Sequence, residues 1–151
     1  PIPRSQPKRV DNPLSKTVLV IDDDRDIREV AKVTLELVGG FTVLTAESGS
    51  RGLLVAQEAK PDAIILDLMM PEMDGQETLA QLKRDPGTAC IPVIMLTAKV
   101  HAPKHDLIAR GSAAGILLKP FDAMLLSKQV CEILGWGLSA KDEGVGDSAA
   151  R

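Results

Sequence analysis

A short apolar run that ends in a carboxylate is the feature that most constrains this chain. Residues 63–66 read Ala-Ile-Ile-Leu, Asp67 follows at once, and a loop containing Met and Pro leads to Asp74-Gly75. An apolar run of this length, bounded by turn residues, predicts a fully buried strand. Open α/β sheets gather functional groups at the carboxyl ends of their strands. We therefore expect a functional role for Asp67, although an isolated Asp more often only begins a turn.

Three further predicted strands also end in polar side chains. A run at 17–21 leads to three acidic residues, a run at 92–96 leads to a threonine, and a run at 114–118 leads to a lysine. These residues are Asp22, Asp23, Asp24, Thr97 and Lys119. Alone, the acidic run would serve equally well as a helix cap. Because the carboxyl ends of parallel strands share one edge, we expect these groups to gather beside Asp67.

Helical patterns alternate with these strands. They cover about 25–38, 50–59, 76–84, 103–110 and 122–134, and a second strand fits 41–45. Five strands alternating with five helices predict an α/β fold with a doubly wound, five-stranded parallel sheet. A flavodoxin-like order, 2-1-3-4-5, places strands one and three side by side, where Asp22, Asp23 and Asp67 would meet.

Two details of the core are also predicted. On the first helix, apolar spacing indicates one buried face made of Ile27, Val30, Ala31, Thr34, Leu37 and Val38. Cys90 and Cys131 each stand beside apolar residues, and we interpret both as small core residues rather than a disulfide or a metal pair.

Length and composition limit the domain organisation and the function. The 151 residues fit one domain at 16–138, with a flexible, Pro-rich N-terminal arm at 1–15 and a flexible polar tail at 139–151. The net charge of −3 and an aromatic content of 2% argue against direct binding of nucleic acid. No apolar run approaches the roughly 18 residues that span a bilayer, and no signal peptide is visible. We expect a cytoplasmic protein with no membrane contact.

Three converging carboxylates require charge compensation. A like-charged pair about 4 Å apart costs on the order of 4 kcal/mol near a protein surface. A bound cation or raised pKa values relieve that cost, and a set of carboxylate oxygens suits Mg²⁺. With the Thr97 hydroxyl and the Lys119 ammonium nearby, the set has the parts that phosphoryl transfer needs. Asp67 would attack phosphorus and become an acyl phosphate.

The order and separation of these motifs resemble the receiver domain of two-component response regulators, over about 17–135. The matching segments are Val-Ile-Asp22-Asp23-Asp24, Leu66-Asp67 through Asp74-Gly75, Thr97-Ala98 and Lys119-Pro120-Phe121. The resemblance implies that Asp67 is the phosphoacceptor, and that Asp22, Asp23, Asp67 and the Met69 backbone carbonyl hold Mg²⁺. It also implies that Thr97 and Lys119 contact the phosphoryl group, and that Lys119-Pro120 is a cis peptide.

The same resemblance implies signalling rather than enzymatic turnover. A histidine kinase or a phosphotransfer protein would donate the phosphoryl group, and a downstream target would bind the face formed by helix four, strand five and helix five. Ile116 occupies the strand position where the family often has Tyr or Phe. Two alternatives remain: a phosphate-independent interaction domain, or an aspartyl-nucleophile phosphatase. The phosphatase is disfavoured because Met69 stands where such enzymes prefer a second Asp.

Overall fold

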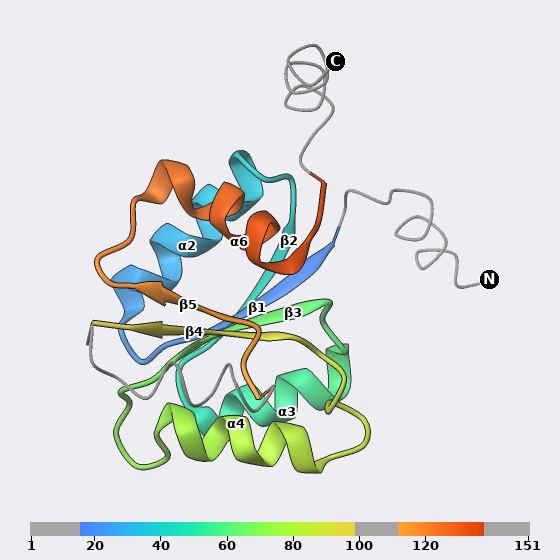
Figure 1. Cartoon of the computed structure of the whole chain (residues 1–151). Coiled ribbons are helices and arrows are strands. Elements are labelled where there is room, and N and C mark those ends of the chain that lie inside the picture. The colour runs from blue at the N-terminus through green and yellow to red at the C-terminus, as the bar shows by residue number, and fades with distance from the viewer. Residues whose placement is uncertain (1–15, 99–111, 138–151) are drawn as a thin grey trace, which may run out of the picture.

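The computed structural model describes residues 16–98 and 112–137, and these form one parallel sheet flanked by helices (Figure 1). The strand order is β2-β1-β3-β4-β5, which confirms the predicted order. The strands are β1 Thr17–Ile21, β2 Thr42–Ala46, β3 Ala63–Asp67, β4 Val93–Thr97 and β5 Gly115–Leu118. The three central strands β1, β3 and β4 are buried along their whole length, as their continuous apolar runs predict.

Four α-helices lie within the described residues. They are α2 Arg25–Leu37, α3 Gly49–Ala59, α4 Gly75–Arg84 and α6 Leu126–Leu134, and the 3₁₀ turn η1 Ala123–Leu125 precedes α6. Helices α2 and α6 cover one face of the sheet, and α3 and α4 cover the other (Figure 1). The helix predicted at 103–110 lies outside the described residues. In the described part of the chain, no helix is both long enough and apolar enough to span a bilayer.

Carboxylates fix the starts of α2 and α4, the helices that follow β1 and β3. The Asp24 side chain accepts hydrogen bonds from the backbone amides of Asp26 and Ile27, and Asp74 accepts one from Glu77. Asp24, a member of the acidic run after β1, thus caps the first helix. These caps hold the loops after β1 and β3 in defined positions.

Two aliphatic clusters fill the space on either side of the sheet. One includes Leu19 and Ile64 and lies toward α3 and α4, and the other includes Val18 and Ile65 and lies toward α2 and α6. Successive strand residues point to opposite faces, so a single strand supplies both clusters. The sheet that carries the predicted site therefore has a buried, apolar cluster on each face.

The predicted buried face of the first helix is partly wrong. Leu35 is fully buried, whereas Leu37 is 80% exposed and Val30 and Val38 are also exposed. Burial follows the four-residue step from Ala31 to Leu35, because only this side of α2 faces the sheet. The predicted face was drawn too broadly, and it included the outward side of the helix.

The prediction for the two cysteines is correct for only one of them. Cys131 on α6 is buried, but Cys90 is exposed. Cys90 lies in the turn before β4, and the adjacent Ile91 occupies the buried position there. Apolar neighbours in the sequence were therefore not enough to place Cys90 in the core.

Candidate functional site

Three acidic side chains converge where β1 and β3 end. The two strands are paired, with Ile21 opposite Leu66, so the residues that follow them are neighbours. Carboxylate oxygens of Asp22, Asp23 and Asp67 all lie within 4.8 Å of one another. Asp22 and Asp67 are buried and Asp23 is exposed. The structure therefore brings together the three residues that the strand pattern had placed at one edge.

Lys119 reaches the same cluster from the end of β5. Its Nζ lies 3.0 Å from Asp22 Oδ2 and 3.3 Å from Asp67 Oδ1, and its side chain is 20% exposed. The peptide bond between Lys119 and Pro120 is cis, as the resemblance implied. The ammonium thus spans two buried carboxylates that come from different strands.

Thr97 and Met69 complete the surroundings of Asp67. Thr97 is buried at the end of β4, and its carbonyl accepts a hydrogen bond from the Lys119 amide at 2.8 Å. Leu96, the preceding residue, is opposite Asp67 in the paired strands. The backbone amide of Met69 donates to Asp67 Oδ1 at 3.3 Å. All the predicted site residues therefore lie at one edge of the sheet.

The surroundings of Asp67 disfavour the ionised form of its carboxyl group. Burial and then the Asp22 carboxylate raise the pKa of Asp67 from its ordinary value of 3.8 to about 6, against the opposing effects of Lys119 and the Met69 amide. Burial alone would lower the pKa of Lys119, but its hydrogen bond to Asp22 and the charges of both carboxylates outweigh burial and raise it. One ammonium therefore contacts two of the three clustered carboxyl groups, and a bound cation would relieve the remaining repulsion.

The donor set of this cluster fits a hard divalent cation. All three side chains offer carboxylate oxygens, which Mg²⁺ and Ca²⁺ prefer over nitrogen or sulfur ligands. Asp23 is the exposed member of the set and opens the cluster to solvent. The residues present can thus hold a metal ion beside Asp67.

Arg28 and Gly75 support this site and were not predicted from the sequence. The Arg28 guanidinium donates to the Asp22 carbonyl at 2.8 Å, one turn into α2. A Cβ atom on Gly75 would stand 2.3 Å from the Asp67 carbonyl oxygen, so only glycine fits there without a shift of the backbone. The only signal for Arg28 in the sequence was its position, six residues after Asp22. The close approach of Gly75 depends on loop geometry, which sequence does not reveal.

Comparison with known proteins assigns the chain to a family. The family described as "Response regulator receiver domain" matches residues 18–131. The chain therefore belongs to the response-regulator receiver family, whose general property is an aspartate that can be phosphorylated. Receiver domains interact with kinases and with downstream targets.

Individual relatives agree with this assignment. The phosphate regulon transcriptional regulatory protein PhoB of Pseudomonas aeruginosa is 36% identical over 137 residues, which cover 91% of this chain and 57% of PhoB. Protein PilH of the same species is 35% identical over 118 residues, which cover 78% of this chain and 96% of PilH. The chain thus spans only about half of the PhoB-type regulator but nearly all of PilH.

Solved structures give the same result for the fold. The chemotaxis protein CheY4 of Vibrio cholerae aligns with a TM-score of 0.73 and 33% identity, over 79% of this chain and 98% of CheY4. The N-terminal domain of a response regulator receiver protein from Methanoculleus marisnigri is 40% identical, with a TM-score of 0.65, over 79% of this chain and 96% of that chain.

Proposed function

We propose that Asp67 accepts a phosphoryl group from a histidine kinase or a phosphotransfer protein, in the presence of Mg²⁺, and that the domain then changes its affinity for a partner. One observation supports this proposal most directly. In a chain of the receiver family, a buried Asp67 at the end of β3 lies 3.3 Å from the Lys119 ammonium and within the acidic cluster. This combines a nucleophile, a fixed cation and a metal-compatible donor set.

Each residue has a proposed role in the transfer. An Asp67 carboxylate oxygen attacks phosphorus, the bond from phosphorus to the donor nitrogen breaks, and the product is an acyl phosphate. Asp22, Asp23, Asp67 and the Met69 carbonyl would hold Mg²⁺, with Asp23 as the favoured direct side-chain ligand. When bound, the metal ion would supply positive charge against the phosphoryl oxygens.

Lys119 and Thr97 would act on the product. The Lys119 ammonium already contacts Asp67 and would pair with a phosphoryl oxygen once Asp67 is modified. The Thr97 hydroxyl would bond another phosphoryl oxygen. Formation of this bond would move the end of β4 relative to its position in the unphosphorylated domain. A partner that binds the phosphorylated state more tightly would then respond to the modification.

We propose that the partner binds a face that includes β5. Leu118, which precedes Lys119 on β5, and Met124 on η1 are exposed apolar side chains. Ile116 is half-buried against the aliphatic cluster, so the switch would repack aliphatic side chains rather than turn an aromatic ring. We expect the domain itself to act in the cytoplasm without contacting nucleic acid, given its net charge of −3.

Incubation with acetyl phosphate and Mg²⁺, followed by intact mass measurement, tests the proposal. The parent chain should gain one phosphoryl group, Asp67→Asn should gain none, and EDTA should prevent the gain. Asp26→Asn removes an exposed carboxylate outside the cluster and should behave like the parent. An equal gain by Asp67→Asn would reject the assignment. Steady release of phosphate from monoesters would instead favour a phosphatase, and target binding unaffected by Asp67→Asn would favour a phosphate-independent interaction domain.

A further inference from the structure

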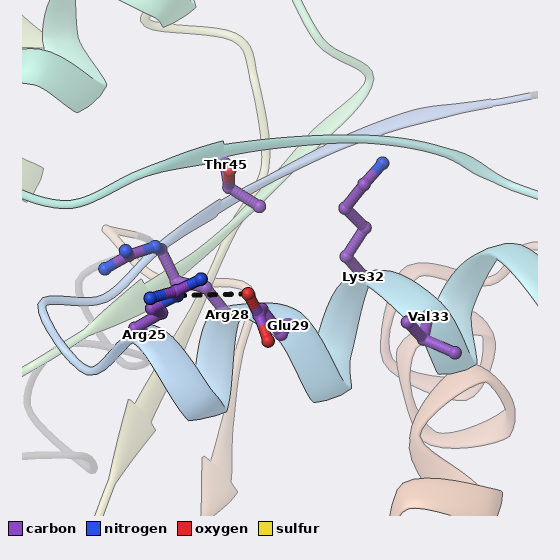
Figure 2. A pocket seen from close by; sticks show the side chains of 6 residues that line it. All are labelled: Arg25, Arg28, Glu29, Lys32, Val33 and Thr45. Atoms are coloured by element: carbon purple, nitrogen blue, oxygen red, sulfur yellow. Dashed lines mark hydrogen bonds and ion pairs between the residues drawn. The ribbon is translucent and has the colours of Figure 1, made fainter.

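A pocket lined by charged side chains lies between α2 and the edge strand β2, apart from the acidic cluster. The pocket, of about 410 Å³, is lined by Arg25, Arg28, Glu29, Lys32, Val33 and Thr45 (Figure 2). This volume falls in the range of small-molecule sites. Among the described residues that line it, three are cationic and one is a carboxylate. The pocket therefore has an excess of positive charge within a chain of net charge −3.

The cations of this pocket keep donors available. Arg25 Nε pairs with Glu29 at 3.1 Å, but both side chains are more than half exposed, so the pair contributes little and opens easily. Lys32 pairs with Glu36 and also approaches the Val43 carbonyl. Each arginine has five N–H donors, and the hydrogen bonds among described residues use one donor of Arg25 and one of Arg28. An anion could engage the remaining donors without breaking buried contacts.

The geometry suits a compact ligand. Figure 2 shows Thr45 on β2 directed toward α2, with Arg25 and Arg28 on one side and Lys32 on the other. Lys32 lies against the carbonyl of Val43 on edge strand β2, which obstructs pairing of a peptide strand at that point. Planar guanidinium groups bind phosphate and carboxylate oxygens in pairs. We propose that this pocket binds a small polyanion, such as a molecule carrying a diphosphate group.

Arg28 connects this pocket to the acidic cluster. One guanidinium nitrogen holds the Asp22 carbonyl at 2.8 Å, while the side chain also lines the pocket. An anion that engages the other donors of Arg28 would shift the shared guanidinium group, and so change the geometry of its bond to Asp22 without breaking it. That carbonyl belongs to the same peptide unit as the Asp23 amide, so the Asp23 N–H resonance reports on the contact. Anion binding itself does not depend on the proposed function; any effect on phosphorylation rests on it.

Titration of the parent chain with inorganic pyrophosphate, followed by amide NMR, tests the proposal. EDTA keeps divalent cations off the acidic cluster, and constant ionic strength separates binding from screening. The amides of Arg25, Lys32 and Thr45 should shift to saturation, together with the amide of Asp23. The variant Arg25→Gln/Lys32→Gln should bind at least about tenfold more weakly, because charge-assisted hydrogen bonds are lost.

A charge-matched control keeps this test specific. Arg84→Gln/Lys128→Gln removes two exposed cations from other helices and should retain the parent's affinity. Shifts that grow linearly with pyrophosphate, or equal weakening in both double variants, would mean general charge attraction and would overturn the site. Saturable shifts that leave Asp23 unchanged would overturn its link to the acidic cluster. Because these outcomes do not depend on phosphorylation, failure of the acetyl phosphate experiment would leave the titration interpretable.

Discussion

Replacing Asp67 by Asn should stabilise the fold at neutral pH in the absence of metal. Asp67 is almost fully buried, and its pKa is raised from 3.8 to about 6, first by burial and then by Asp22. A raised pKa means that the ionised form is disfavoured in the folded state. A rise of this size corresponds to about 3 kcal/mol, since each tenfold change in proton affinity is worth about 1.4 kcal/mol. Asn is neutral and nearly isosteric, so it removes that cost.

The sign of the pH dependence follows from proton binding. Between about pH 4 and pH 6 the folded chain keeps a proton on Asp67 that the unfolded chain has lost, so the free energy of unfolding falls as pH rises. Below about pH 4 both states are protonated, and Asp67→Asn should differ little from the parent. Above about pH 6 the variant should be more stable by up to about 3 kcal/mol.

Urea unfolding of both chains in EDTA, from pH 4 to pH 8, measures this difference. The gain in the free energy of unfolding of Asp67→Asn over the parent should increase from about pH 4 to about pH 6 and then level off. Saturating Mg²⁺ should reduce it, because the metal stabilises only a folded chain with an intact site. Asp26→Asn serves as a control for loss of an exposed carboxylate. A variant that is less stable than the parent at pH 8 in EDTA would refute the argument, because it would mean that Lys119 outweighs burial and Asp22.

Three further predictions concern single contacts. Lys119→Gln removes the ammonium that lowers the pKa of Asp67, so NMR titration of the Asp67 carboxyl should give a value above about 6; an unchanged value would contradict the 3.3 Å contact. Gly75→Ala places a methyl group against the Asp67 carbonyl and should lower the free energy of unfolding by about 1–3 kcal/mol; no loss in urea unfolding would exclude that close approach. Ser127→Ala removes a buried hydroxyl that has no hydrogen-bond partner among the described residues, and should leave thermal stability unchanged or raise it by up to about 1 kcal/mol. A clear loss would reveal a partner.

The central sheet was predictable because its signal is local. The apolar runs are short and each is followed by a polar residue, and parallel strands bring such ends together. Because parallel strands end at a common edge, Asp22, Asp67 and Lys119 were predicted to lie together there. In the structure, Lys119 contacts both carboxylates. The cis peptide before Pro120 came from family resemblance rather than from physical reasoning.

Other features depended on packing that the sequence does not encode locally. The inward side of α2 was misjudged because helical spacing alone does not say which side meets the sheet, so Leu35 was missed and Leu37 was wrongly placed inside. Cys90 was misplaced for a similar reason, since its turn buries Thr88 and the following Ile91 but leaves Cys90 exposed. The bond from Arg28 to Asp22 depends on where α2 begins relative to β1.

Locating the phosphoryl group tests the proposed role of Asp67 most directly. After incubation with acetyl phosphate and Mg²⁺, borohydride reduction converts an acyl phosphate to an alcohol that survives digestion and peptide mass spectrometry. We expect reduction at Asp67 and at no other carboxylate of the cluster. Reduction at Asp22 or Asp23, or none at all under conditions that modify a known receiver domain, would contradict it.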